Sequence, residues 1–460
     1  MNLLLPPLWP IIAAATEVET EAGPLILAGV LLSLVVIYFA SKLGGEVCLR
    51  LNLPPVLGEL VGGVVIGVSV FKLLLFPEGG LSAEDSLIMQ LLLKSTDLSL
   101  EGAQSVFAAQ SEVVSIISEL GVIILLFEIG LESNLKELIR VGPQAAIVAV
   151  VGVVTPFSLG TIGLIYLFGV APIPAVFAGA ALTATSIGIT AKVLAEINRL
   201  STNEGQIIIG AAVLDDILGI IVLAVVGSLV KTGEIEISNI VYLIISATAF
   251  VVGSILIGRF LSPFYVSLVN RMKTRGQLLL VSLCVAFVLS FIAQVVQLEA
   301  ILGSFAAGLV LAETEKREEL EEQILPIADF FVPVFFVCVG AKTDIGVLNP
   351  AIPANREGLV IAAFLILVAI VGKVVTGFTL FGKPELNKWA IGVGMIPRGE
   401  VGLVFAGVGA ASGALTSSTE AAIIMMVIVT TFVAPPWLRL VFKDSDAKPA
   451  ETPVTSEGKS

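Results

Sequence analysis

Long apolar runs separated by shorter polar segments account for most of this chain. A membrane-spanning helix needs about 20 predominantly apolar residues. Thirteen runs are candidates: residues 24–43, 54–76, 112–131, 143–169, 174–195, 205–230, 239–261, 276–296, 299–312, 326–345, 358–381, 388–411 and 419–441. The ninth run is short and begins almost where the eighth ends. The pattern predicts an all-α polytopic membrane protein, with about 13 transmembrane helices in a membrane domain over residues 24–441.

The two ends of the chain and one long connection lie outside these runs. Residues 1–23 are expected to form an N-terminal extracytoplasmic segment, and they lack the basic leader of a signal peptide. Residues 77–111 are acidic, and their piece SLIMQLLLK is expected to form a helix in the membrane interface or in an ordinary loop. Residues 442–460 are polar and are predicted to form a disordered cytoplasmic tail.

The composition agrees with a membrane location and narrows the possible chemistry. Hydrophobic residues make up 57% of the chain and charged residues only 14%, against about 45–50% and 25% in soluble domains. The chain has no histidine, which excludes His-ligated metal sites and leaves carboxylates or a lysine for proton chemistry near neutral pH. The net charge of −13 lies mostly in the loops and the tail. Neither a cofactor nor a nucleic-acid partner is expected; the surrounding partner is membrane lipid.

The basic residues predict the orientation of the chain in the membrane. If the first segment runs from outside to inside, eighteen of the 25 Lys and Arg residues fall on the inner side and five on the outer side. Only Lys373 and Arg398 remain at membrane depth. This asymmetry follows the positive-inside rule and places the N-terminus outside and the C-terminus inside. This orientation is expected in a bacterial inner membrane and equally in a photosynthetic thylakoid membrane, because both face the same cytosol.

A few charged residues lie deep inside apolar runs, at a common level. Asp215 and Asp216 are adjacent in the sixth run, about ten residues or ~15 Å from its inner end. Each such charge costs roughly 2.5–3.5 kcal/mol to insert, so we interpret the pair as a functional site. Lys373 lies at a similar depth. Its charge could serve either the function or only the structure, in both cases as one half of an ion pair. Arg398 and Glu400 lie near the middle of the twelfth run.

Two of the runs carry features that interrupt a helix. The fifth contains Thr183, Thr185 and Ser186 among small residues, as possible cation ligands or as a packing surface. In the twelfth, Pro397 and the glycine after Arg398 are expected to break the helical hydrogen bonds near mid-membrane. Each broken run is the middle one of three consecutive runs, and the two sets begin on opposite sides of the membrane. This arrangement predicts inverted repeats with a transport site at their broken helices.

Seven motifs in this order resemble the monovalent cation:proton antiporter superfamily, and most of all its bacterial sodium/proton branch with thirteen helices and an aspartate pair. The motifs are LPPVLGELVGGVVIG (53–67), LLFEIGLE (125–132), TATSIGITAKVLAE (183–196), AAVLDDILGI (211–220), PVFFVCVGAKTD (333–344), VGKVVTG (371–377) and GMIPRGEVGLV (394–404). The resemblance covers about residues 24–441. It implies an elevator-type exchanger of sodium, and of lithium as a second cation, for protons. The exchange would be electrogenic, and the protein a homodimer with two crossed broken helices and interleaved core and dimerisation bundles.

The same resemblance implies roles for individual residues. Asp216 would be the principal carboxylate that binds the sodium ion and the proton, and Asp215 would share the site and pair with Lys373. Thr185 and Ser186, at the break of the fifth segment, would contribute oxygen ligands. Arg398 and Glu400 match a motif in the second broken helix that is structural.

Other functions remain open from the sequence. Potassium/proton exchange is the main alternative, because a sequence does not give the size of an ion cavity. An intramembrane aspartyl protease needs two aspartates that face each other from separate helices, whereas Asp215 and Asp216 are adjacent on one helix, about 100° apart. A channel would conduct ions without proton exchange, and the buried Lys373 argues against it.

Overall fold

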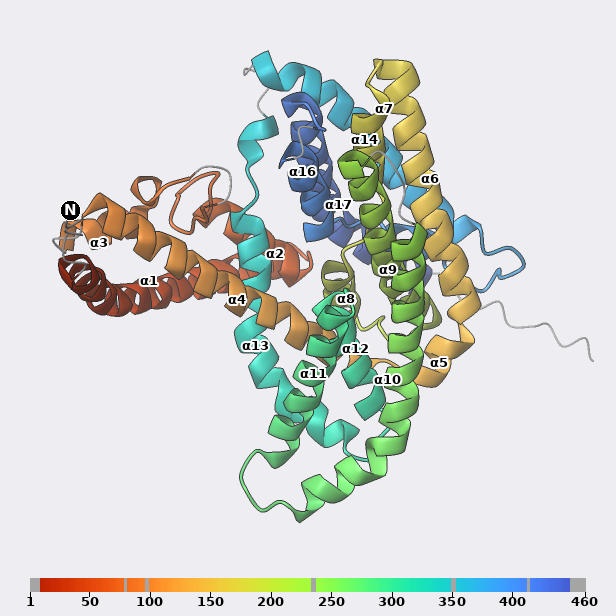
Figure 1. Cartoon of the computed structure of the whole chain (residues 1–460). Helices are drawn as coiled ribbons and strands as arrows, with labels where there is room; N and C mark the ends of the chain where they lie inside the picture. Colours follow the sequence, from red (N-terminus) through yellow and green to blue (C-terminus); the bar gives the residue numbers. More distant parts are fainter. Residues whose placement is uncertain are drawn as a thin grey trace, which may run out of the picture.

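The computed structural model describes residues 9–77, 81–95, 99–232, 237–348, 353–411 and 414–446, and all regular elements within these ranges are helical (Figure 1). The α-helices are α1 Trp9–Arg50, α2 Pro55–Ile66, α3 Leu87–Ser95, α4 Leu100–Glu132, α5 Leu135–Arg140, α6 Gly142–Phe168, α7 Pro172–Ala181, α8 Ile187–Glu196, α9 Asn203–Thr232, α10 Ile237–Arg271, α11 Gln277–Val295, α12 Ala300–Leu311, α13 Arg317–Ala341, α14 Pro353–Phe378, α15 Lys388–Gly394, α16 Glu400–Ala411 and α17 Ser417–Asp446. Two short 3-10 helices, η2 Ala83–Asp85 and η3 Ile345–Leu348, lie in connections.

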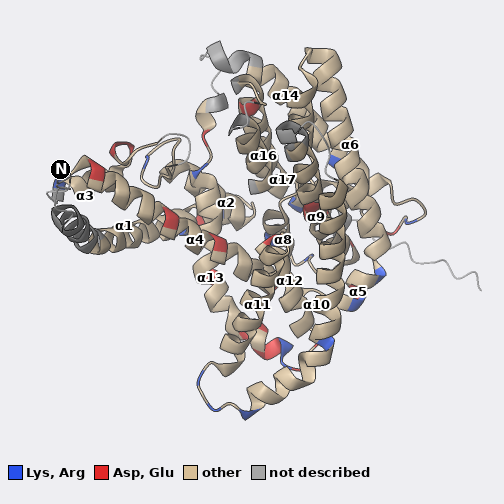
Figure 2. Cartoon of the chain, in the orientation of Figure 1, with Lys and Arg blue, Asp and Glu red and all other residues tan. Residues whose placement is uncertain are grey.

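Each of the thirteen predicted segments contains one long helix, one short apolar helix or one pair of half-helices. Nine helices of the described residues are long and apolar enough to cross a membrane. The short apolar helices α2 and α12 and the pairs α7/α8 and α15/α16 account for the other four segments. The prediction of an all-α polytopic membrane protein is therefore confirmed. In Figure 2 the helix surfaces are largely uncharged, and many of the Lys and Arg residues lie in loops and at helix ends.

Several helices extend beyond the predicted membrane segments. Helix α1 begins at Trp9, well before residue 24, and α17 continues to Asp446, past the predicted start of the tail at 442. Residues 1–8 and 447–460 lie outside the described residues. Helix α4 begins at Leu100 rather than at 112, because the Ser99 side chain accepts a hydrogen bond from the Gly102 amide and caps this earlier start.

Helix α2 is shorter than its predicted span of residues 54–76. It ends at Ile66, because Gly67 is extended and its backbone packs against the end of α13. The amide of Val68 donates a hydrogen bond to the carbonyl of Ala341 at 3.1 Å. A β-carbon at Gly67 would lie 2.3 Å from the same carbonyl oxygen, so only glycine permits this approach.

The helices form two packed groups. Helices α6, α7, α9, α14, α15, α16 and α17 contact mainly one another and are called the first group. Helices α1, α2, α4, α11, α12 and α13 form the second group, while α8 and α10 contact members of both. In Figure 1, α1 and α4 extend to one side of the molecule and α6, α9 and α14 stand at the other.

Close contact within the second group depends on small residues. Helices α4 and α12 meet at Gly130 and Gly308. A β-carbon on Gly130 would lie 2.4 Å from the carbonyl oxygen of Phe305, and one on Gly308 would lie 2.2 Å from that of Phe127. Helix association in lipid relies on such packing, because lipid is as apolar as the side chains.

The first group contains the order of helices that the repeat prediction requires. A long helix, an interrupted helix and a long helix follow each other twice, as α6, α7/α8, α9 and as α14, α15/α16, α17. Four helices, α10 to α13, separate the two sets. Counted from α6, seven predicted segments precede α14, an odd number, as inverted repeats require.

Candidate ion-binding site

Two interrupted helices cross inside the first group. The fifth segment breaks between Ala181 and Ile187, and the twelfth between Gly394 and Glu400. Pro397 lies inside the second break, where it has no amide hydrogen to donate and its ring excludes a continuing helix. Both breaks were predicted from the sequence, and both are confirmed.

The two breaks are joined by hydrogen bonds between residues far apart in the sequence. The Ser186 amide donates to the Pro397 carbonyl at 2.8 Å, and the Thr185 hydroxyl donates to the Met395 carbonyl at 3.1 Å. These bonds satisfy backbone carbonyls that the interrupted helix leaves without helical partners. Each hydroxyl oxygen keeps lone pairs with which it can also coordinate a cation.

Asp215 and Lys373 form a buried ion pair, as predicted. The Lys373 ammonium lies 2.9 Å from Oδ2 of Asp215, and both side chains are fully buried. The other oxygen of Asp215, Oδ1, accepts no hydrogen bond from the described residues. Gly152 of α6 gives the ammonium its space, because a β-carbon there would lie 3.1 Å from Nζ.

Arg398 lies in the second break and is also fully buried. Its Nη1 donates to the Met395 carbonyl at 3.3 Å, and its own carbonyl accepts from the Thr431 hydroxyl at 2.6 Å. Asp215 acts on the Arg398 charge electrostatically. These contacts hold the break in place and agree with a structural role. Glu400 begins α16, and its side chain lies outside what the structure describes.

Asp216 faces a separate small cavity. The cavity has a volume of about 10 Å³, close to the space of one water molecule. Asp216 lines it together with Thr185 and Ser186, and it is only 4% exposed. The structure thus brings three of the four predicted ion-binding residues to one chamber. The fourth, Asp215, precedes Asp216 on α9, does not line the chamber, and pairs with Lys373 of α14 instead. Carboxylate and hydroxyl oxygens are the donor types that hard cations take.

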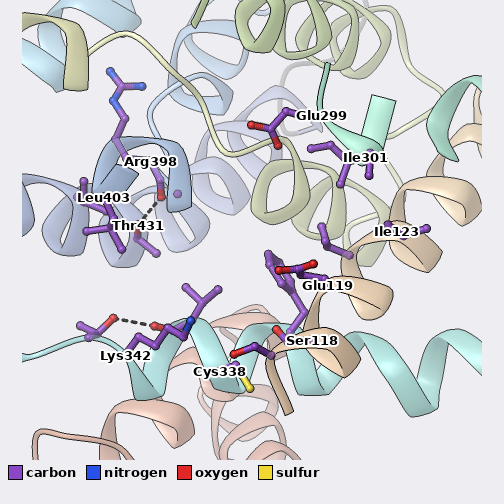
Figure 3. A pocket seen from close by; sticks show the side chains of 18 of the residues that line it. Ser118, Glu119, Ile123, Glu299, Ile301, Cys338, Lys342, Arg398, Leu403 and Thr431 are labelled. Carbon is purple, nitrogen blue, oxygen red and sulfur yellow. Dashed lines mark hydrogen bonds between the residues drawn. The ribbon is translucent and has the colours of Figure 1, made fainter. Parts of the chain in front are cut away.

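A much larger cavity of about 630 Å³ lies between the two helix groups (Figure 3). Parts of α4, α12 and α13 form one wall, and residues near the second break and on α17 form the other. Its lining side chains include Ser118, Glu119, Glu299, Ile301, Cys338, Lys342, Leu403 and Thr431. Glu299, Ile301 and Gly399 line this cavity and the small one as well. The large cavity therefore borders the chamber of Asp216.

The sequence reasoning did not single out Glu299. It precedes α12, at the start of the short ninth segment, where an acid is easily taken for an ordinary interfacial charge. The only signal was a carboxylate at the junction of two apolar runs in a chain with few charges. Its position beside Asp216 depends on the packing of α12 against other helices, which the sequence does not show.

Three partly buried acids, Glu59, Glu128 and Glu196, lie away from the chamber of Asp216. Lys192 of α8 acts electrostatically on Glu59, Glu128 and Glu196. The Glu196 carboxylate accepts a hydrogen bond from the Val56 amide at 3.2 Å, which ties the end of α8 to the start of α2. Glu59 and Glu128 lie within electrostatic reach of Lys192 and do not line the chamber of Asp216.

Comparison with known proteins identifies relatives over nearly the whole chain. The family model "Sodium/hydrogen exchanger, transmembrane" matches residues 26–444. The High-affinity Na(+)/H(+) antiporter NhaS3 of Synechocystis sp. is 86% identical over 98% of this chain and 99% of its own length. The Probable Na(+)/H(+) antiporter GerT of Bacillus cereus is 32% identical over 89% of this chain and 98% of its own length.

A solved structure has the same fold at low sequence identity. The sodium proton antiporter MjNhaP1 of Methanocaldococcus jannaschii aligns with a TM-score of 0.62 and 16% identity, over 91% of this chain and 98% of its own. Because the family model matches most of the chain and both relatives align over nearly all of it, this integral, multi-pass membrane protein belongs to the transmembrane sodium/hydrogen exchanger family.

Proposed function

We propose that this protein exchanges sodium ions for protons across a membrane and that Asp216 binds both. The observation that carries the proposal is the small chamber where Asp216 meets Thr185 and Ser186, next to the buried pair of Asp215 and Lys373. The 86% identity to NhaS3, a protein named as a high-affinity sodium/proton antiporter, supports the same exchange here.

Competition for one carboxylate couples the two ions. A sodium ion that loses most of its water needs hard oxygens, and the chamber offers a carboxylate and two hydroxyls. A proton on Asp216 removes the negative charge that attracts the cation. Lys373 neutralises Asp215, and Arg398 adds a second buried positive charge that acts on Asp215, so the net charge of the site changes with what Asp216 binds. Either occupant neutralises the Asp216 carboxylate, so moving the site through the membrane has a different electrostatic cost with an occupant than without one.

Alternating access arises from movement of the first helix group against the second. The first group holds the site and acts as the mobile core; the second acts as the scaffold that carries the dimer interface. With the N-terminus outside, α12 begins near the outer side and α8 ends near the inner side. The large cavity then opens outward, and the Val56–Glu196 contact closes the inner side. An elevator movement would break this contact and carry Asp216 to the inner side.

The ion and the stoichiometry are the finer parts of this proposal. Sodium is favoured over potassium by the similarity to NhaS3, and lithium, a still smaller hard cation, is expected to substitute for it. We propose more than one proton for each sodium ion, as the resemblance to the aspartate-pair exchangers implies, with the proton beyond the one on Asp216 carried by the pair of Asp215 and Lys373. The exchange would then be electrogenic, which a voltage-sensitive dye detects as a membrane potential built up by the sodium gradient.

A homodimer in the cytoplasmic or thylakoid membrane completes the proposal. Leu27, Leu31, Val35 and Phe39 are at least half exposed and recur every four residues along α1, so they form one apolar stripe. This stripe would face a second copy of the chain. Pairwise crosslinking of single-cysteine variants along it, in a background without the native cysteines, tests that arrangement in the membrane.

Transport by the purified protein in liposomes tests the exchange itself. A pH gradient is imposed, sodium, lithium or potassium is added outside, and internal pH is read with a dye. We expect proton flux with sodium and lithium and much less with potassium. Absence of any cation-dependent proton flux would refute antiport, and equal flux with potassium would refute the preference for sodium.

A further inference from the structure

Glu299 occupies the junction between the two cavities. It lines the large cavity with Glu119 and Lys342, and it lines the small one with Asp216 and Ser186. In Figure 3 its carboxylate extends from the start of α12 into the space that separates it from Arg398 and Leu403. A cation that passes from the large cavity into the chamber therefore passes this carboxylate.

The two cavities differ in the hydration that they permit. A volume of about 630 Å³ holds a cation with its water shell, whereas about 10 Å³ holds roughly one water-sized occupant. The cation must therefore exchange water for protein oxygens at the junction. Glu299 is the side chain there that combines negative charge with hard oxygen donors.

Glu299 belongs to a different helix group from the other donors of the chamber. Asp216 lies on α9, and Thr185 and Ser186 lie in the first break, all within or beside the first group. Glu299 precedes α12 of the second group. If the groups move against each other during transport, Glu299 can contact the cation only while the chamber communicates with the large cavity.

Capping of α12 does not explain why residue 299 is a glutamate. It is the residue before α12, yet its side chain makes no capping hydrogen bond to that helix. Helix starts favour Ser, Thr, Asp or Asn for capping, not Glu. The positive end of the α12 dipole does favour a negative charge at this place. Glutamine in its place keeps the size and the backbone conformation and removes only the charge.

From these observations we propose that Glu299 is a further cation-coordinating residue of the exchanger, which receives the cation from the large cavity and passes it to Asp216. The proposal rests on the antiport function proposed above. It assigns Glu299 an effect on one side of the membrane only, because the residue stays with the second group. The side is the one that the large cavity faces.

Kinetics in membrane vesicles of both orientations test this proposal. Exchange is measured with sodium added from either side, for the full-length protein and for Glu299→Gln. We expect the apparent KM for sodium to rise about tenfold from the large-cavity side and less than twofold from the other side, with kcat nearly unchanged. Glu119→Gln is the matched control, because Glu119 is exposed in the large cavity and absent from the small one, and it should change neither KM by more than twofold.

The outcomes separate this inference from the proposed function. If the unaltered protein exchanges sodium for protons and Glu299→Gln leaves both KM values within twofold, the role of Glu299 is refuted and antiport stands. A rise of equal size from both sides would also refute it, because a structural effect on the site has no preferred side. Glu299→Asp, which keeps the charge, is expected to show a smaller rise from the large-cavity side alone and serves if Glu299→Gln does not fold.

Discussion

Neutralising Lys373 alone should destabilise the protein more than neutralising Lys373 and Asp215 together. The two charges lie 2.9 Å apart and both side chains are fully buried. With an effective dielectric constant of about 20, such a pair attracts by roughly 6 kcal/mol, most of which offsets the loss of hydration. Removing one partner leaves the other buried without compensation, which costs about 3–5 kcal/mol.

Arg398 makes the two single variants unequal. It interacts electrostatically with both Asp215 and Lys373. In Lys373→Gln the Arg398 charge still compensates Asp215. We therefore expect the free energy of unfolding to fall by about 3 kcal/mol, the lower end of the range for removing one partner of a buried pair. In Asp215→Asn two buried positive charges remain beside each other, so the loss should be larger. The loss of stability in the double variant Asp215→Asn/Lys373→Gln should be smaller than the sum of the two single losses by at least about 2 kcal/mol.

Equilibrium unfolding in mixed micelles, followed by tryptophan fluorescence, measures these free energies for the four proteins. Glu46→Gln is the control, because Glu46 and Arg50 are also 2.9 Å apart but mostly exposed, and its effect should be at most about 1 kcal/mol. The reasoning would be refuted if Lys373→Gln changed the free energy of unfolding no more than Glu46→Gln, or if the two single effects simply added.

Three further changes test the crossing of the broken helices. Gly399→Ala should slow exchange strongly, because the added methyl would lie 2.9 Å from the Ser186 hydroxyl oxygen. Wild-type rates of this variant in the transport assay would show that the packing is unimportant. Gly407→Ala in α16, the helix that follows the break, is its control, because the added methyl meets no atom within 4 Å. Thermal unfolding of this control should show unchanged or slightly raised stability. Thr190→Val removes the 2.9 Å hydrogen bond to the Gly394 carbonyl and should lower the free energy of unfolding by about 1–3 kcal/mol; a neutral effect would mean that this carbonyl finds another donor.

The parts of the site that local chemistry determines were predictable from the sequence. Pro397 breaks a helix wherever it lies inside one, and the cost of buried charge made Asp215, Asp216 and Lys373 conspicuous. Depth along each run placed Lys373 at the level of the aspartate pair, and the resemblance to the antiporter superfamily implied that Asp215 is its partner. The structure confirms that pair at 2.9 Å.

The parts that depend on packing between helices were not predictable. The early end of α2 follows from the close approach of Gly67 to Ala341, which lies more than 270 positions later in the chain. The bond between Ser186 and Pro397 requires that two particular breaks meet. Glu299 becomes part of the site only because α12 packs beside the first break. Composition and periodicity describe single helices and carry no information on such neighbours.

Proton release on sodium binding tests the central claim most directly. The measurement needs no transport and shows whether sodium and protons compete for Asp216. Sodium chloride is added to the purified protein in a weakly buffered detergent solution, and the released protons are titrated. We expect sodium to release protons from the unaltered protein in a saturable way, potassium to release far fewer, and Asp216→Asn to release none. Proton release from Asp216→Asn equal to that of the unaltered protein would contradict the assignment of Asp216 as the shared site.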